Sequence, residues 1–309
     1  MSFSKNVLPG ILSLGLTSCL GSFQVVHLNN AQPYEKYDNI PAQEEIKSIT
    51  FAHLNAADLR GNTPYLFKVI SEKEAREHAQ WLGNFLLKEK VSIISLNEVD
   101  YAGTIKTGSL DQPKIIAEYM GAPYDYILFD QYLKSPLWTT GNAVISSLPV
   151  KAVHRYLYGE DCRNPDTRLG HLFKDFIHTK IKVGTKTIDL ITTHLDDADG
   201  EYDFRKKEEA QELVDYVTGL KQKDPNSYII AAGDYNDGYR SETMKIILSS
   251  GILYPPAENF GLKTYQNGNL TNDLDHILAS SNIRIYNYRT FVFPWSDHLG
   301  LMCELEFLE

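Results

Sequence analysis

The amino-acid sequence predicts an α/β fold, a four-layered α/β sandwich in which two packed mixed β-sheets are flanked by helices. Short apolar or alternating segments, typical of strands, outnumber the amphipathic segments typical of helices, and both kinds are interspersed along the chain. Many strand-like segments also end or begin in Asp, Asn, Glu or His. This pattern indicates a rigid frame that presents polar side chains from distant segments at one rim.

The elements of the N-terminal half follow this pattern. The first expected strand, 46–55, alternates β-branched and aromatic residues with others and ends at Asn55. A Ser-x-x-Glu capping box then opens an amphipathic helix over 71–88. The next strand, 91–100, is nearly all apolar and ends in a polar group that includes Glu98. The other elements of this half are a helix at 111–120 and strands at 124–130, 142–146, 151–158 and 172–183.

The C-terminal half repeats the pattern. The strand in 187–197 ends at His194, and the apolar segment "SYIIAAG" leads directly to Asp234 and Asn236. A further strand-like segment begins with Asp275. The other elements are helices at 203–220 and 240–250 and a closing strand that follows Asp297 and His298.

The first twenty residues differ in composition from the rest. A positive start at Lys5, a short apolar stretch and small residues have the layout of a secretory signal, and the stretch is shorter than the about 20 apolar residues that span a bilayer. The "LTSC" that follows resembles a bacterial lipobox. We therefore expect a lipoprotein-type signal peptide over 1–18, a lipid anchor at Cys19, a tether over 19–46 and one domain over 47–309. The expected location is the bacterial cell envelope; the alternatives are an ordinary signal followed by secretion and a disordered apolar start.

The charge of the chain limits the partners without deciding the substrate. A formal net charge of −10 and a pI near 5.4 argue against broad, metal-free attraction to nucleic acid or to an anionic membrane. They do not exclude phosphate chemistry, because clustered carboxylates bind divalent cations, which reverse the local sign of the field. Cys162 and Cys303 either pair in a disulfide or remain buried thiols, and both alternatives stay open. We expect a monomer.

The polar residues at the strand ends form a complete set for metal-assisted hydrolysis. Singly, a strand-end Asp or Asn is most often a turn former or a helix cap. Six such segments in one chain favour a shared site instead. The set comprises the metal-type oxygens of Asn55, Glu98 and Asp297, the imidazoles of His194 and His298, and the further carboxylates of Asp234 and Asp275.

Seven short motifs occur in a fixed order: "HLNAADL", "SLNEVD", "GNAVISSLP", "TTHLDD", "AGDYND", "LDHIL" and "WSDHLGL". With this order and spacing, the sequence resembles the endonuclease/exonuclease/phosphatase superfamily of metal-dependent phosphoesterases over about residues 47–309. The resemblance implies that Glu98 is the principal ligand of a Mg²⁺ ion, with Mn²⁺ as an alternative. It also implies that Asn55 helps to position the metal and a phosphate oxygen, and that Asp297 lies beside the metal.

The same resemblance implies roles for the remaining residues. Asp234 would orient or deprotonate the attacking water, and Asn236 would hold that water or the phosphate by hydrogen bonds. His298 would face the phosphate, while Asp275 would bond to its far nitrogen and fix its tautomer. His194 would stabilise charge on the phosphoryl oxygens.

The sequence departs from the family pattern at several positions. Asn97 stands where many members have Gln before the metal-binding Glu, which would change a neighbouring contact. Ala57 stands where nuclease-like members often have an acidic residue, and Asp58, one place further, would face the other way on a regular strand. Ser147 stands where Arg is common, which removes a possible phosphate-binding charge. His53 is read more readily as a structural histidine than as a residue of the rim.

The sequence therefore predicts a Mg²⁺-dependent phosphoric ester hydrolase that acts on a phosphodiester. The "NEVD" and "THLD" motifs and the expected membrane tether favour a phospholipid or a small phosphodiester as substrate. An exported endonuclease acting on nucleic acid is the alternative, and an inactive, lipid-anchored binding protein is the alternative of another class. A basic stripe with stacking aromatics would favour nucleic acid, whereas an exposed apolar loop would favour lipid.

Overall fold

The computed structural model describes most of the expected domain. The described residues are 44–61, 69–101, 107–123, 127–134, 139–158, 174–197, 200, 203–267 and 270–308. The expected signal peptide, the anchor at Cys19 and nearly all of the expected tether lie outside them, as does Cys162. Cys303 is a buried free thiol.

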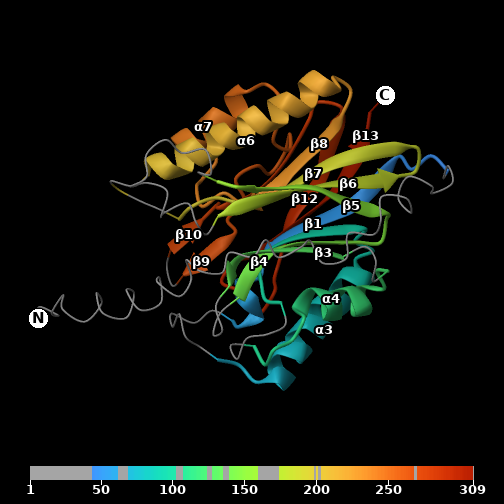
Figure 1. The fold of residues 1–309 in the computed structure, drawn as a ribbon, viewed down its shortest axis with the longest axis vertical. Coiled ribbons are helices and arrows are strands. Elements are labelled where there is room, and N and C mark those ends of the chain that lie inside the picture. The colour runs from blue at the N-terminus through green and yellow to red at the C-terminus, as the bar shows by residue number, and fades with distance from the viewer. Residues whose placement is uncertain are drawn as a thin grey trace, which may run out of the picture.

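Two mixed β-sheets form the centre of the molecule (Figure 1). The strands of sheet A are β1 (Ser48–Asn55), β2 (Ile93–Val99), β3 (Ile127–Lys134), β4 (Thr139–Ser146), β12 (Ile283–Phe291) and β13 (Gly300–Phe307). The strands of sheet B are β5 (Val150–Leu157), β6 (Asp175–Val183), β7 (Lys186–His194), β8 (Tyr228–Asp234) and β11 (Asp275–Ala279). Sheet A has the order β12-β13-β1-β2-β4-β3 and sheet B the order β11-β8-β7-β6-β5. A separate hairpin consists of β9 (Tyr265–Asn267) and β10 (Leu270–Asn272).

Helices cover the outer face of each sheet, so that the predicted four-layered α/β sandwich is confirmed (Figure 1). The covering helices are α3 (Glu72–Lys88) and α4 (Gln112–Met120) on sheet A, and α6 (Phe204–Lys223) and α7 (Glu242–Ser249) on sheet B. α3 begins with the expected capping box, in which Ser71 and Glu74 satisfy each other's backbone N–H groups. Among the described helices, none combines the length and the apolar character that crossing a membrane requires.

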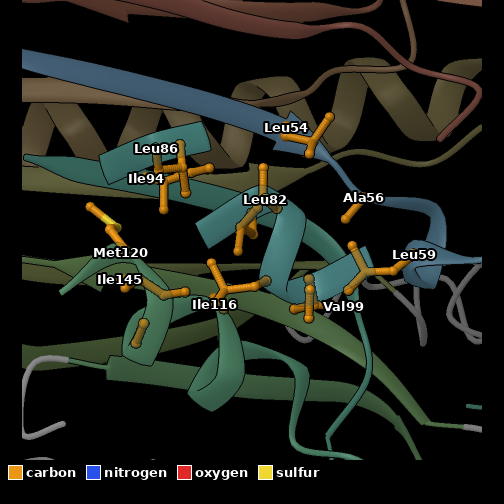
Figure 2. Packing of buried hydrophobic residues seen from close by; sticks show 14 of the residues in the cluster. Leu54, Ala56, Leu59, Leu82, Leu86, Ile94, Val99, Ile116, Met120 and Ile145 are labelled. Carbon is orange, nitrogen blue, oxygen red and sulfur yellow. The ribbon is translucent and has the colours of Figure 1, made fainter. Parts of the chain in front are cut away.

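Three apolar clusters hold the layers together. One packs α3 and α4 on sheet A and includes Ile116 and Ile145 (Figure 2). A second fills the space between the sheets, where Phe51 of β1 and Ile230 of β8 are both fully buried. The third packs α6 and α7 on sheet B through residues such as Leu213. Because the central strands are buried on both faces, they read in the sequence as nearly continuous apolar runs.

The strand directions explain why polar residues follow these apolar runs. β1 is parallel to β2, with Asn55 opposite Asn97, and β7 is parallel to β8, with His194 opposite Asp234. β11 is antiparallel to β8 and begins where β8 ends, with Asp275 opposite Asp234. The polar residues at the ends of β1, β2, β7 and β8 and at the start of β11 therefore lie at the same edge of the sandwich.

Two features of the fold were not predicted from the sequence. β12 pairs antiparallel with β13 and forms the edge of sheet A, and the hairpin of β9 and β10 lies in a segment for which no element was expected. Alternating burial in β12, with Ile283 and Ile285 buried and Arg284 exposed, is the signal that could have identified it.

Gly233 allows β8 to approach β7 closely just before Asp234. A Cβ atom at Gly233 would clash with the backbone oxygen of Thr193, which the strand pairing holds in place. We expect Gly233→Ala to lower the free energy of unfolding by about 2–3 kcal/mol, measured by urea denaturation. Gly219→Ala in α6, where nothing lies within 4 Å of the added Cβ, should instead raise it by about 0.5–1 kcal/mol. Equal effects at both positions would contradict the close approach.

Candidate active site

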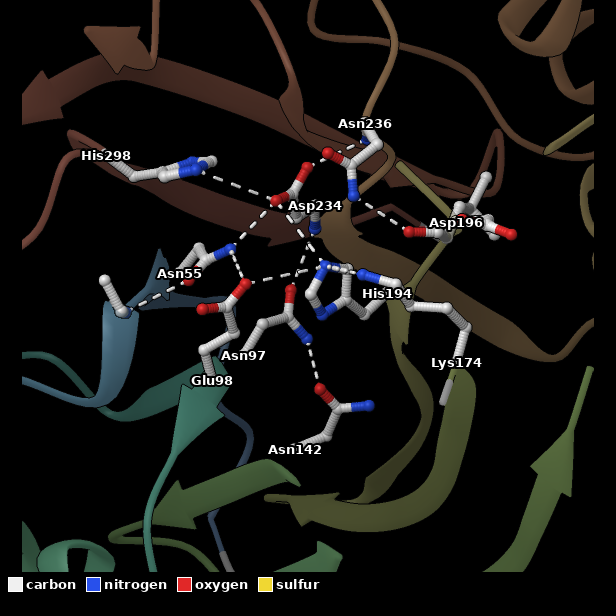
Figure 3. Close-up of polar contacts among 12 residues, drawn as sticks. Asn55, Asn97, Glu98, Asn142, Lys174, His194, Asp196, Asp234, Asn236 and His298 are labelled. Carbon is white, nitrogen blue, oxygen red and sulfur yellow. Dashed lines mark hydrogen bonds and ion pairs between the residues drawn. The ribbon is translucent and has the colours of Figure 1, made fainter. Parts of the chain in front are cut away.

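Side chains from both sheets meet at the polar edge of the sandwich (Figure 3). They come from segments that lie far apart in the sequence, and most of them are buried. Sheet A and its loops provide Asn55, Asn97, Glu98, Asn142 and His298, and sheet B and its loops provide Lys174, His194, Asp234, Asn236 and Asp275. The site is thus a seam between the two sheets.

Glu98 is the half-open carboxylate of the seam, with 34% of its side chain exposed. Its φ of +50° lies in the left-handed region, at an irregularity between Leu96 and Val99 in the pairing of β2 with β4. Asn55 Nδ2 donates to Glu98 Oε1 at 3.1 Å and to Asp234 Oδ2 at 2.8 Å. One amide therefore holds a carboxylate from each sheet. The positive φ of Glu98 and the irregular pairing around it are unfavourable backbone features, and such features often occur at functional sites.

Asp234 is the buried carboxylate of the seam. Its backbone N–H donates to Asn97 Oδ1 at 2.8 Å, and its Oδ1 accepts the backbone N–H of Asn236 at 2.8 Å. Asn236 has a φ of +51°, and its Nδ2 donates to the Leu195 carbonyl at 2.8 Å. The segment after β8 is thus tied back to β7 and across to β2, which fixes the direction of the Asp234 side chain.

Asp275 lies between two imidazoles. Its Oδ2 accepts from His298 Nδ1 at 2.7 Å, as the family resemblance implied, and its Oδ1 accepts from His53 Nε2 at 3.1 Å. His298 Nε2 then faces Asp234, 3.8 Å from Oδ2. The expected reading of His53 as a structural histidine omitted this contact.

The donor chemistry of the seam suits a hard divalent cation such as Mg²⁺ or Mn²⁺. Asp234, Asp275 and His298 offer ligand atoms that all lie within 4.8 Å of one another. Because both oxygens of Asp275 already accept hydrogen bonds from imidazoles, Asp275 is best suited to orient His53 and His298. The carboxylate best placed to hold a cation is then the half-open Glu98, which the Asn55 amide brings beside Asp234.

Lys174, immediately before β6, supplies a positive charge on the sheet B side of the seam. Its Nζ lies 2.7 Å from His194 Nε2, which in turn lies 3.7 Å from Asp234 Oδ2 and 3.9 Å from Glu98 Oε1. An ammonium group can only donate, so His194 Nε2 accepts and its proton lies on Nδ1. With this tautomer His194 Nε2 has no proton to give to a phosphoryl oxygen, and Lys174 carries the charge at this point.

Burial and charge together set the protonation of these groups. Burial lowers the pKa of His194 well below its usual value, and the neighbouring Lys174 lowers it further, so the imidazole is neutral. Burial and the charge of Asp275 raise the pKa of Asp234 above its usual value. Burial disfavours the charged form of His298, yet the charges of Asp275 and Asp234 outweigh it and raise its pKa to about 10.

A chain of buried amides joins the sheets beneath the seam. Asn97 Nδ2 donates to Asn142 Oδ1 at 2.6 Å (Figure 3). Asn142 Nδ2 donates to Asp175 Oδ1 on sheet B at 2.6 Å. Arg155 Nε donates to the other oxygen of Asp175 at 3.2 Å. Asn97, which replaces the common Gln, therefore bridges β2 to β4 with its amino group and to β8 with its carbonyl. Lys174 was not selected from the sequence, because it does not stand in one of the polar strand ends. Asn142 begins the strand expected at 142–146 but was given no role.

Several other predicted positions lie in distinct surroundings. Asp297 is half-buried beside His298, and its backbone carbonyl accepts from Gln266. Asp58 is buried and pairs with Arg60 at 3.0 Å. The reading of Ser147 as a lost phosphate-binding position is wrong, because Ser147 bonds to Ser92 at the opposite end of β2 from Glu98.

The raised pKa of His298 predicts a pH dependence of stability in the metal-free protein. The stabilising contribution of the charged imidazole is complete below about pH 6.5, the ordinary pKa of histidine, and is lost as the pH rises towards 10. The difference in unfolding free energy between wild type and His298→Gln should therefore shrink between pH 6.5 and 10. Urea denaturation in the presence of a chelator measures it. A difference that stays constant with pH would show that His298 is not charged in the folded protein.

Comparison with known proteins identifies the family of this chain. Residues 67–298 match the model of the endonuclease/exonuclease/phosphatase family. Sphingomyelinase C from Bacillus cereus is 24% identical over 172 residues, which are 52% of this chain and 50% of that protein. The chain thus matches only half the length of that relative.

Solved structures share the fold at low identity. An endonuclease/exonuclease/phosphatase from Beutenbergia cavernae is similar with a TM-score of 0.64 at 19% identity, covering 85% of this chain and 72% of that one. The human Nocturnin catalytic domain with bound sulfate anion is similar with a TM-score of 0.61 at 17% identity, covering 86% and 95%. The family match over most of the sequence shows that the chain belongs to the endonuclease/exonuclease/phosphatase family of phosphoesterases.

Proposed function

We propose that this chain is a divalent-metal-dependent phosphodiesterase that acts on a phospholipid or another small phosphodiester. The observation that carries the proposal is the Asn55 amide, which holds the half-open Glu98 carboxylate and the buried Asp234 carboxylate side by side. Two carboxylates from separate sheets, held beside each other by one amide at a partly open edge, form a site for a cation and for a water that one of them can deprotonate.

Each charged residue of the seam has a chemical task in this proposal. A divalent cation held by Glu98, with Mg²⁺ as the first candidate, would supply Lewis acidity to a phosphoryl oxygen. Asp234 accepts a proton from the attacking water, and its raised pKa makes it a stronger base than an ordinary aspartate. His298, charged and held by Asp275, donates its Nε2–H to a phosphate oxygen. Lys174 stabilises the charge that develops on the phosphoryl group.

Charge at the rim supports a small or zwitterionic substrate over a nucleic acid. Asp196 and Asp197 follow His194, and Asp203 begins the next helix. Of the basic residues there, Arg205 pairs with Asp196 at 3.3 Å and Lys207 with Asp203 at 2.6 Å. A polyanion would approach these carboxylates at a cost, whereas a zwitterionic headgroup places a cation near them. The similarity to sphingomyelinase C supports the same choice, as does the envelope anchor that we propose at Cys19.

Metal-dependent turnover tests the proposal directly. Sphingomyelin vesicles, phosphatidylglycerol vesicles, plasmid DNA, RNA and a chromogenic phosphodiester are compared in Mg²⁺, in Mn²⁺ and in chelator. We expect Glu98→Gln to lower kcat by at least about 100-fold, because the principal anionic ligand is lost. Glu242→Gln, an exposed carboxylate on α7 that pairs with Lys245, is the matched control and should leave turnover unchanged.

The outcomes separate the candidate functions. Selective hydrolysis of the zwitterionic lipid, lost in Glu98→Gln, supports the proposal. Selective cleavage of DNA or RNA would instead assign a nuclease. If no substrate is turned over faster by wild type than by Glu98→Gln, the hydrolase proposal fails and a binding protein becomes the better account.

Lys174 provides a second test on the active protein. Lys174→Met should lower kcat/KM by about 100-fold, since it removes the positive charge aimed at the phosphoryl group. Lys207→Met, an exposed lysine on the neighbouring α6, should have no effect on kcat/KM. An unchanged kcat/KM in Lys174→Met would remove Lys174 from the proposed mechanism.

A further inference from the structure

The inner face of sheet A changes from apolar to polar in a single step below the seam. The parallel register of β1 and β2 pairs Phe51 with Ile93 and, one step nearer the rim, His53 with Ser95. The first pair belongs to the apolar cluster between the sheets. By pattern, an apolar residue would also fit at position 53, so an imidazole there needs a reason beyond packing.

His53 is completely buried, and both of its ring nitrogens have partners. Nδ1 lies 3.2 Å from Ser95 Oγ, and Nε2 lies 3.1 Å from Asp275 Oδ1 on the opposite sheet. A carboxylate can only accept, so His53 carries a proton on Nε2 that it donates to Asp275, while Nδ1 pairs with the Ser95 hydroxyl. These two bonds fix the ring orientation of His53 without any contact with solvent.

The carboxylate of Asp275 is consequently held at both ends. His53 donates to Oδ1, and His298 donates to Oδ2 at 2.7 Å. A carboxylate with one bond can rotate about its χ2 angle, whereas one held through both oxygens has a fixed plane. That plane sets the direction in which His298 presents Nε2 to Asp234.

We propose that His53 is a positioning residue, which fixes the Asp275 carboxylate from the core side and thereby aims His298 at the reacting phosphate. His53 touches neither substrate nor metal and acts only through Asp275. This inference rests on the proposed phosphodiesterase function, because the direction of His298 matters only if that imidazole takes part in the reaction.

A second buried His–Asp pair provides the control. His178 Nε2 lies 2.7 Å from Asp189 Oδ1, and Nδ1 lies 2.8 Å from the hydroxyl of Tyr216. This pair joins β6, β7 and α6 on the outer face of sheet B, and His178 is as buried as His53. Loss of either imidazole should cost similar stability, but only His53 faces the seam.

The test compares steady-state kinetics of the full chain on the best substrate of the panel. His53→Leu should lower kcat by about 10–100-fold with little change in KM, as expected when a residue that orients a catalytic group is lost. His53→Gln, whose amide can donate to Asp275 from nearly the same place, should recover kcat to within about 3-fold of wild type. His178→Leu should keep the wild-type kcat despite a comparable fall in unfolding free energy.

A spectroscopic measurement keeps the inference testable if the protein shows no turnover or if His53→Leu does not fold. Long-range ¹H–¹⁵N spectra report the tautomer of each histidine ring. In the wild type, His53 should carry a proton on Nε2. The ring signals of His298 should shift in His53→Asn, because the shorter Asn amide cannot reach Asp275. They should remain in place in the control His178→Leu.

The two proposals fail in different ways. No metal-dependent turnover, with the expected spectra, would overturn the hydrolase proposal and leave the His53–Asp275–His298 contact intact. Normal kcat in both His53→Leu and His53→Asn, or unchanged His298 signals in His53→Asn, would overturn the role of His53.

Discussion

The site depends on one point of contact between the two sheets, where Asp234 at the end of β8 meets Asn55 and Asn97 of sheet A. Its carboxylate accepts from Asn55, and its backbone N–H donates to Asn97. Away from this polar edge the sheets meet through the apolar cluster between them, whose side chains fill space without fixing a register between the layers. Directional hydrogen bonds at the polar edge supply that register, because a shift of either sheet would leave buried amides and carboxylates without partners.

Two residues with unfavourable backbone angles lie at the same place. Glu98 and Asn236, on opposite sheets, both have positive φ angles; Glu98 lies at the irregularity near the end of β2, and Asn236 comes just after β8, which is paired with β7. Such conformations persist only where the surroundings determine them fully. Here the buried amide chain from Asn97 to Asp175 and the close approach at Gly233 provide that support. The strands therefore act as a frame that fixes two carboxylates and two imidazoles before any ligand binds.

The sequence allowed the layers, most strands and the residues at strand ends to be predicted, because each follows from local periodicity or from a short motif. Lys174 escaped prediction, since it stands alone before β6 and meets His194 only through the antiparallel pairing of β6 with β7. His53 was read as structural because its partner Asp275 is 222 residues away. Contacts across the space between two sheets, such as that of His53 with Asp275, leave no periodic signal in either strand. β12 is a different case, because its residues alternate and the strand was still missed.

A crystal structure with Mn²⁺ and inorganic phosphate, read by anomalous scattering, would test the central claim most directly. We predict an anomalous peak about 2.0–2.3 Å from a carboxylate oxygen of Glu98, on the side that faces Asn55 and Asp234, with phosphate between that ion and His298. The peak should be absent in crystals of Glu98→Gln. An ion bound away from the seam, or the same peak in Glu98→Gln, would contradict the assignment of this edge as the catalytic site.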